Sequence, residues 1–548
     1  MNMKKYLYIA MMVVGLTSLS SCEGDFDANI YGTLSTTNFP KTGDDYESYM
    51  MECYLPFCSH WSYKLADYNQ RQWFCATGGI MKYFDSTADD MTQTVIVTYG
   101  GGWTEITQCY YENFKNAART ASDGYPNHFE KIRDITRFTQ VIQTLENAEP
   151  NTTFSAQKKA ELTGEARLLR GMMLYYMLHV FGPVPVIVDA SKIGVAEEEA
   201  YLVRPTLKEY VQYITDDLEF AAANMAEKQK EKGRYTADFA RFYLMHHYLN
   251  EGYHMEGYYQ KAYDMFNQFK GGYSLYTEGA NPYIDQFSVN HKFNSEVIMA
   301  MSCSTAGNGS AANGNMNCMT YYCFPGDASP KDDKGDALLP FANQNRGAGN
   351  GWRQCFAVSK AFYDSFEEGD LRKAGIVTRY YSKNGYWVDE SKIGDLWDGY
   401  ICNKYNPESS TTQYQGNDVA LARWADVLLM YAEADVRAHN SVSATAINAV
   451  NQVRQRAGID NLTSDKTSSV SAFMDAILEE RGHELWFEGQ RKIDLIRFNK
   501  YYTTMNALGR TPTSEYIPLP DYAVEQAANS GHTLEQYFTR DNYDGPKK

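Results

Sequence analysis

Two glutamates on one predicted helix have a spacing that is compatible with acid–base catalysis. Glu480 and Glu484 lie four residues apart, so a helix would place both carboxylates on one face. Such a pair could act as general acid and base in the hydrolysis of a glycosidic bond. However, the same stretch also carries Arg481, Glu488 and Arg491 at helical spacing. We therefore favour a network of ion pairs, and predict that the chain is not an enzyme.

The sequence contains no complete motif for metal binding, nucleophilic catalysis or phosphate binding. His246, His247 and His254 are close in sequence, but no HExxH pattern or nearby cysteine completes a metal-binding set. We expect these histidines to be solvated helix residues. Neither a GxSxG nucleophile elbow nor a phosphate-binding GxxxxGK loop occurs. The sequence therefore predicts no metal and no cofactor.

The chain around these residues alternates between helical and loop-rich stretches. Helical patterns cover about 128–272 and 355–500, and loop-rich stretches cover about 40–110 and 275–352. Within the helical parts, Thr206 and Glu209 have the spacing of a capping box. We expect the last long helical stretch to break near Gly489, and residues from Asp521 onward to form a polar tail.

The charge balance argues against one class of partner. The chain of 548 residues has 51 Lys and Arg against 68 Asp and Glu, for a formal net charge of −17. Nucleic-acid binding requires a basic face, so we expect no nucleic-acid partner. A hydrophobic content of 44% is ordinary for a folded protein.

The N-terminus has the pattern of an export signal. Lys4 and Lys5 precede an apolar run that ends at Leu16 and is too short to span a bilayer. Leu19-Ser20-Ser21-Cys22 resembles the lipobox of bacterial lipoproteins, in which Cys22 would carry the lipid. We predict a signal peptide over 1–21 and an exported, lipid-anchored chain over 22–548. The nine remaining cysteines are expected to be buried free thiols.

Five motifs resemble those of the SusD/RagB family of outer-membrane lipoproteins. They are Gly164–Arg170, Phe181–Pro185, Ala422–Ala434, Ile447–Gly458 and Ile477–Arg491. They occur in the order found in that family, behind a lipobox. The resemblance implies an all-α fold of tetratricopeptide-like helix pairs into which a loop-rich region is inserted.

The same resemblance implies a function. Members of the family lie on the cell surface, anchored by lipid to the outer membrane, and bind oligo- or polysaccharides without catalysis. They pass these ligands to a SusC-like TonB-dependent transporter. Two alternatives stay open: a RagB-like lid that binds oligopeptides, and a surface glycoside hydrolase.

Aromatic residues on the loop-rich stretches are the candidate ligand contacts. The chain has 44 Tyr but 26 Phe, and because a buried tyrosine hydroxyl needs a partner, this excess indicates half-exposed aromatic surface. Exposed rings can stack on the apolar face of a sugar, while amides and carboxylates bind its hydroxyls. The alternative is packing within the loops, and we assign Trp424 and Trp486 to the core. The predicted site residues are Trp73, Tyr83 and Trp103, near Asp85, Asp89 and Asp90, together with Tyr283, Tyr321 and Trp352, near Asn343, Asn345 and Arg353.

Overall fold

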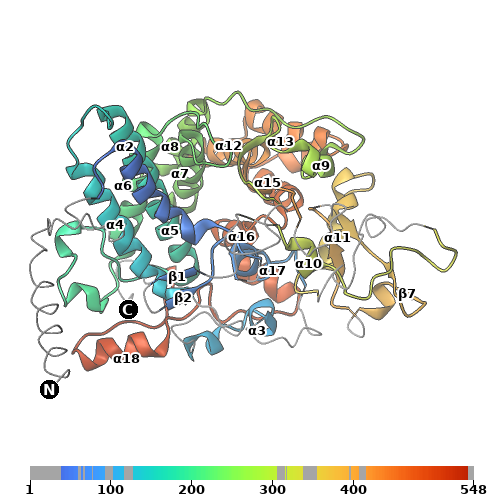
Figure 1. Ribbon diagram of the computed structural model, residues 1–548. Coiled ribbons are helices and arrows are strands. Elements are labelled where there is room, and N and C mark those ends of the chain that lie inside the picture. Colours follow the sequence, from blue (N-terminus) through green and yellow to red (C-terminus); the bar gives the residue numbers. More distant parts are fainter. Residues whose placement is uncertain are drawn as a thin grey trace, which may run out of the picture.

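Helices that pack in chain order form one part of the molecule (Figure 1). The computed structural model describes residues 39–59, 63–65, 68–76, 78–92, 103–116, 128–304, 315, 317–336, 354–393, 397–405 and 415–540. The first helical block consists of α4 (Ile132–Asn147), α5 (Ala156–Phe181), α6 (Leu207–Asn224), α7 (Ala237–Glu251) and α8 (Tyr258–Met265). Each of these helices contacts the next along the chain, and α2 (Gly43–Met51) packs against α5. This arrangement confirms the predicted helix pairs.

Local signals set the ends of several of these helices. Thr206 caps α6 by accepting a hydrogen bond from the Glu209 backbone nitrogen, and the Glu209 carboxylate accepts one from the Thr206 backbone in return. This is the capping box that the sequence predicts. Helix α5 ends at Gly182, whose φ of +74° is a left-handed conformation that favours glycine.

A loop-rich region is inserted between α8 and α12 (Trp424–His439). These two helices contact one another although the insertion separates them in sequence. At the neck of the insertion, β3 (Val297–Met301) pairs antiparallel with β9 (Val419–Arg423), with Val297 opposite Arg423 and Met301 opposite Val419. The part of the insertion between β3 and β9 thus begins and ends at one two-stranded sheet. A loop-rich insertion into the helical scaffold is what the family resemblance implies.

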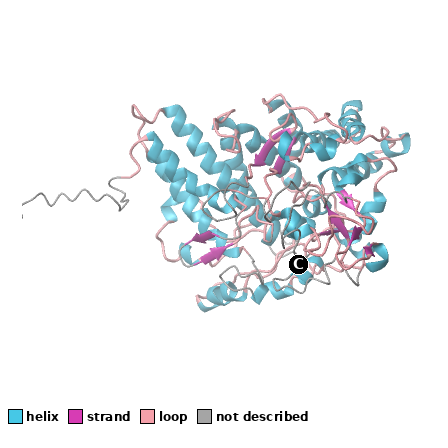
Figure 2. Ribbon diagram, turned by 45° about the vertical axis from the view of Figure 1, so that its right-hand side comes forward, coloured by secondary structure: helices cyan, strands magenta, loops and turns pink. Residues whose placement is uncertain are grey.

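Short elements build the rest of the insertion. Figure 2 shows the strands as small, separate patches among helices and loops. Strands β4 (Ala357–Val358), β8 (Tyr400–Cys402) and β5 (Ile376–Val377) form a sheet in that order, and β6 (Tyr380–Tyr381) pairs with β7 (Trp387–Val388). The helices here are α9 (Pro282–Asp285), α10 (Met319–Cys323) and α11 (Lys360–Ser365).

A second helical block follows the insertion. It consists of α12, α13 (Ala444–Arg456), α14 (Ser464–Thr467), α15 (Val470–Leu485), α16 (Arg491–Arg497) and α17 (Tyr501–Ala507). The predicted break falls between α15 and α16, where Gly489 has a φ of +77° and a Cβ atom would lie 2.6 Å from Ile80. Close packing and the backbone conformation therefore both require glycine at this position.

The prediction that residues from Asp521 onward form a polar tail is wrong. Residues Asp521–Asn529 form α18, and Ala523 and Ala527 on it are buried. Apolar residues at this spacing place one face of the helix against the protein.

Trp486 is buried in the core as predicted, whereas Trp424 is half-buried and packs against the core's edge.

The remaining short elements precede the first block. They are β1 (Tyr63–Leu65), β2 (Tyr68–Gln70) and α3 (Trp103–Thr107), and β1 and β2 pair antiparallel. None of the described helices combines the length and the apolar character needed to cross a membrane.

Candidate ligand-binding surface

The first group of predicted aromatic residues lies inside the protein. Trp73, Tyr83 and Trp103 are each at most 2% exposed. The Trp73 ring stacks on that of His128, with centroids 4.4 Å apart, and its indole nitrogen donates a hydrogen bond to the Met173 sulfur. Because a sugar can stack only on an exposed ring face, the structure does not support these three residues as ligand contacts.

The acidic residues near this group have structural partners. Asp85 accepts hydrogen bonds from the backbone nitrogens of Gly489 and Gln490 at 2.7 and 3.2 Å. Asp89 forms an ion pair with Arg491, with nitrogen and oxygen 2.7 Å apart. These carboxylates hold the segment that begins α16, so they do not present free acceptors to sugar hydroxyls.

The second predicted group is divided between core and surface. Tyr283 is fully buried, and its hydroxyl donates a hydrogen bond to the Glu484 carbonyl oxygen at 2.9 Å. Tyr321 on α10 is half-buried and stands edge-on to Tyr322, with ring centroids 5.2 Å apart. Trp352 lies outside the described residues, as do Asn343, Asn345, Arg353 and the lipidation candidate Cys22. Of the predicted aromatics that the structure describes, Tyr321 alone is partly exposed.

A hairpin in the insertion presents aromatic residues that the sequence analysis missed. Strands β6 and β7 pair with Tyr381 opposite Trp387. The Ser382 backbone nitrogen donates to the Tyr386 carbonyl oxygen at 2.9 Å, which closes a three-residue loop. The last loop residue, Gly385, has a φ of +89°. Glycine in a left-handed conformation is the usual requirement of this type of hairpin.

Three side chains of this hairpin form a surface that could contact a ligand. The rings of Tyr381 and Trp387 meet edge to face with centroids 5.5 Å apart, and the Arg379 guanidinium lies 4.5 Å from the Trp387 centroid. Tyr386 is 40% exposed. Because alternate residues face opposite sides, Tyr386 is directed away from Tyr381 and Trp387, and we call Arg379, Tyr381 and Trp387 the hairpin surface. It combines ring faces with a hydrogen-bond donor, which suits a polyhydroxylated ligand.

Polar contacts fix the hairpin to the rest of the insertion. The Asp327 carboxylate accepts hydrogen bonds from the hydroxyls of Tyr380 and Ser382 at 3.1 and 2.7 Å. The Ser329 backbone nitrogen donates to the Tyr381 carbonyl oxygen at 2.7 Å. A site on an element held in this way loses less conformational entropy when a ligand binds.

The sequence does contain a signal for this hairpin. Asn384-Gly385 is a dipeptide typical of tight turns, and aromatic pairs flank it at Tyr380-Tyr381 and Tyr386-Trp387. In a strand pair, alternate residues face opposite sides, and the structure buries Tyr380 and Val388 while Tyr381 and Trp387 are half-buried. This alternation separates the partly exposed Tyr381 and Trp387 from the buried Tyr380 and Val388.

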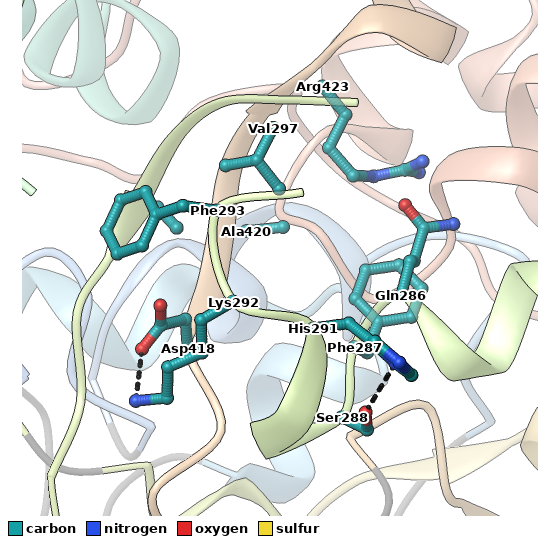
Figure 3. Close-up of a pocket in the computed structure, with 11 residues that line it drawn as sticks. Gln286, Phe287, Ser288, His291, Lys292, Phe293, Val297, Asp418, Ala420 and Arg423 are labelled. Atoms are coloured by element: carbon teal, nitrogen blue, oxygen red, sulfur yellow. Dashed lines mark hydrogen bonds and ion pairs between the residues drawn. The ribbon is translucent and has the colours of Figure 1, made fainter. Parts of the chain in front are cut away.

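A small cavity beside the neck of the insertion is not a sugar site (Figure 3). Its volume is about 20 Å³, which is room for about one water molecule. Two of its lining residues, Lys292 and Asp418, form an ion pair at 2.8 Å, and the Ser288 hydroxyl lies 3.0 Å from the His291 ring nitrogen. A second cavity of about 620 Å³ is lined by none of the predicted site residues.

Arginines from other elements hold the motif glutamates. Glu484 pairs with Arg423 at 2.9 Å and with Arg456, while Glu480 pairs with Arg372 at 2.5 Å. Burial alone would raise the pKa of Glu484, but the guanidinium groups of Arg456 and Arg423 outweigh burial and lower this pKa to about 2. A carboxylate with so low a pKa is a poor proton donor or acceptor near neutral pH. The pairs are ionic as predicted, but they run between elements rather than along one helix.

His246 and His247 are buried, so our prediction that they are solvated is wrong. The His246 ring nitrogen lies 2.8 Å from an Asp426 carboxylate oxygen, and the His247 ring nitrogen lies 2.9 Å from the Thr215 hydroxyl. Helix α7 is packed between α6 and α12, which leaves these side chains no route to solvent. Over the ranges that the structure describes, no group of three or more His, Cys, Asp and Glu side chains could hold a metal ion.

Two family models match consecutive parts of the chain. One, described as starch-binding and associating with the outer membrane, matches residues 64–249. The other is the SusD family model, which matches residues 295–538. The chain belongs to the SusD/RagB family. Together the two models cover the first helical block as far as residue 249, most of the insertion and the second helical block, so the resemblance based on the sequence motifs is confirmed.

Known SusD-like proteins share this fold. The chain is 25% identical over 373 residues to SusD-like protein P25 of Formosa agariphila. This alignment covers 65% of this chain and 67% of that protein. A laminarin-binding SusD-like protein of known structure has a TM-score of 0.65 at 19% identity, with 89% of this chain and 98% of that chain covered. Surface glycan-binding protein A from Bacteroides uniformis has a TM-score of 0.64 at 18% identity, with 90% and 99% covered. At these identities, the two structures show a common SusD-like fold.

Proposed function

We propose that this SusD-like protein captures glycans at the cell surface and passes them to a SusC-like TonB-dependent transporter for import. Membership in the SusD/RagB family is the observation that carries the proposal. One of the two matching models is described as starch-binding. Of two proteins of the same fold, one is named as laminarin-binding and the other as a surface glycan-binding protein. Binding needs no catalytic group, in keeping with motif carboxylates that are held in ion pairs.

The hairpin surface gives this proposal a physical basis. The Trp387 and Tyr381 rings offer apolar area on which the C–H face of a sugar can pack, and Arg379 carries donors for sugar hydroxyls. Tyr321, a predicted site residue that is half-buried, lies in the same insertion. We therefore assign initial glycan contact to the insertion.

Lipid attachment at Cys22 would keep this protein at the outer membrane. The family model that matches residues 64–249 is described as associating with that membrane, which supports a surface location. A lipid-anchored protein at the cell surface could present its insertion to polysaccharides in the medium while staying close to a transporter in the same membrane.

Affinity electrophoresis tests the proposal. The soluble form from Glu23 onward would be run through gels that contain starch, laminarin or other polysaccharides, and the release of reducing sugar would be measured in the same mixtures. We expect at least one polymer to retard the protein without any release of sugar. Sugar release would contradict the proposal and favour a glycoside hydrolase. No retardation by any polymer would contradict glycan capture and favour an oligopeptide ligand.

A further inference from the structure

A groove on the helical scaffold has no role in the proposed function. Its volume of about 620 Å³ lies within the range of ligand pockets in proteins. It lies where the C-terminal ends of α5 and α7 meet α8, α12, α16, α17 and the chain after α18. Among its lining residues are His179, Asn250, Tyr253, Arg437, Tyr502 and Arg540. Figure 1 shows α7 and α8 in the left half of the molecule and β7 at the far right, so the groove is remote from the hairpin surface.

The floor of the groove is held by hydrogen bonds. The Asn250 side-chain nitrogen donates to the Tyr175 hydroxyl at 2.9 Å, and its side-chain oxygen accepts from Arg497 at 2.7 Å. The Tyr516 hydroxyl accepts from Arg540 at 2.6 Å. Side chains fixed in this way do not need to be ordered when a ligand arrives, which favours binding.

The charges around the groove are compensated. Glu433 is fully buried and pairs with both Arg437 and Arg497, at 2.7 and 2.8 Å. Arg540 pairs with Glu251 at 3.2 Å. Each lining guanidinium therefore has a carboxylate partner, and Glu515 adds a further negative charge near Arg540. A groove with this balance offers no net attraction to an anionic or cationic ligand.

Tyrosines form the rim of the groove. Tyr253 follows the C-terminal end of α7 and is 84% exposed, and Tyr502 on α17 is 42% exposed. Tyr259 on α8 is half-buried, and its ring lies 5.3 Å from the Arg437 guanidinium. Exposed aromatic rings around a polar, preorganised floor combine apolar stacking area with hydrogen-bonding groups.

We infer that this groove is a second carbohydrate site, which binds a neutral oligosaccharide by stacking on Tyr253 and Tyr502 over a floor of amide and guanidinium groups. The inference rests on the proposed glycan-binding function and adds a second location to it. The compensated charges favour a neutral sugar over a uronic-acid or sulfated one. Because the groove shares no residue with the hairpin surface, one glycan chain or two separate chains could occupy both sites.

Calorimetric titration of variants tests the inference. The probes are short, neutral malto-, laminari- and cello-oligosaccharides and an anionic oligogalacturonate. The groove variant combines Tyr253→Ala with Tyr502→Ala, and Tyr110→Ala removes a tyrosine of similar exposure elsewhere as a matched control. Because Tyr253 is almost fully exposed, Tyr253→Ala alone serves as a second variant that leaves folding intact. We expect the groove variants to raise the Kd of the neutral probe that binds wild type about tenfold or more, and the control to leave it unchanged.

Hydrogen exchange locates the ligand independently. The bound neutral probe should slow exchange in residues 250–259 and 493–502 of wild type but not of the groove variant. The second site would be overturned if the groove variants kept the wild-type Kd and the probe failed to slow exchange in these two segments of wild type. Weaker binding by a hairpin variant such as Trp387→Ala would then leave the proposed function standing. Tighter binding of oligogalacturonate than of every neutral probe at the groove would overturn the assigned ligand class. No binding of any probe by wild type would overturn both proposals.

Discussion

The buried motif cluster and the hairpin surface use similar residues in opposite ways. In the cluster, Arg423 and Glu484 are fully buried and fixed by ion pairs, so neither is accessible to a ligand. On the hairpin, Arg379 and Trp387 also contact one another, but at the surface. The residues that identify the family therefore maintain its scaffold, whereas the residues proposed to contact a ligand lie outside the motifs and at the surface.

The tryptophans also differ in whether they are buried in the core or lie at the surface. Trp73 and Trp486 are fully buried, and their rings pack against other side chains of the core. Trp387 is half-buried in a hairpin of the insertion. Residue type alone therefore does not identify a stacking platform, since the position of the ring relative to solvent decides its role.

The largest expected effect is on stability, from removal of a charge in the buried cluster. Glu484→Ala would leave Arg423 and Arg456 buried without this partner, which should cost about 3–5 kcal/mol in free energy of unfolding. Glu479→Ala on the same helix is a matched control, because Glu479 is an exposed partner of Lys466 and should cost less than about 1 kcal/mol. Urea unfolding followed by circular dichroism measures both. Equal losses in the two variants would contradict the division into buried scaffold and exposed surface.

Acid should weaken the scaffold in a defined pH range. Burial alone would raise the pKa of Glu433, but the guanidinium groups of Arg497 and Arg437 outweigh burial and lower this pKa to about 2. The neighbouring arginines likewise lower the pKa of Glu484 to about 2. The unfolded chain takes up these protons near pH 4.3, so folding stability is full above about pH 5 and falls as pH drops toward 2. Each group should account for about 2–3 kcal/mol of this loss.

The urea midpoint measured at successive pH values tests this dependence. Glu433→Gln removes one titrating group and should give a shallower decline than wild type between pH 5 and pH 2.5. A midpoint that stays constant over this interval in wild type would contradict the account of the buried carboxylates.

A smaller effect is expected from the hairpin turn. Gly385→Ala forces a side chain into the left-handed conformation at a cost of about 1–2 kcal/mol, which should loosen the hairpin and weaken glycan binding several-fold. Gly194→Ala is the matched control, because Gly194 has a φ of +83° and open space around it but lies outside the insertion. Both variants should unfold near the wild-type temperature, and only Gly385→Ala should change the Kd. A change of Kd in the control as well would contradict the role of the hairpin.

Features set by neighbouring residues could be predicted from the sequence. The Thr206–Glu209 capping box and the break at Gly489 each depend on signals within a few residues, and both are present in the structure. The helix-pair scaffold and its insertion followed from the motifs. The tail from Asp521 was mistaken because its apolar residues, Ala523 and Ala527, are small and give a weak helical pattern.

Features that depend on distant contacts could not be predicted. The partners of Glu484 come from β9 and α13, so helical spacing alone pointed to the wrong arginines. Trp73 is buried because residues near His128 and Met173 pack over it, and nothing in its local sequence indicates this. The candidate contacts of the hairpin, in contrast, have a local signal at Asn384-Gly385.

The most direct test of the central claim compares two tryptophans. Trp387→Ala and Trp73→Ala would each be measured for urea unfolding and for the Kd of the polysaccharide that retards wild type. We predict that Trp387→Ala raises the Kd about tenfold with little loss of stability. Trp73→Ala should lower the free energy of unfolding by about 3–5 kcal/mol, while its folded fraction keeps the wild-type Kd. The reverse result, with affinity lost in folded Trp73→Ala and kept in Trp387→Ala, would contradict the account.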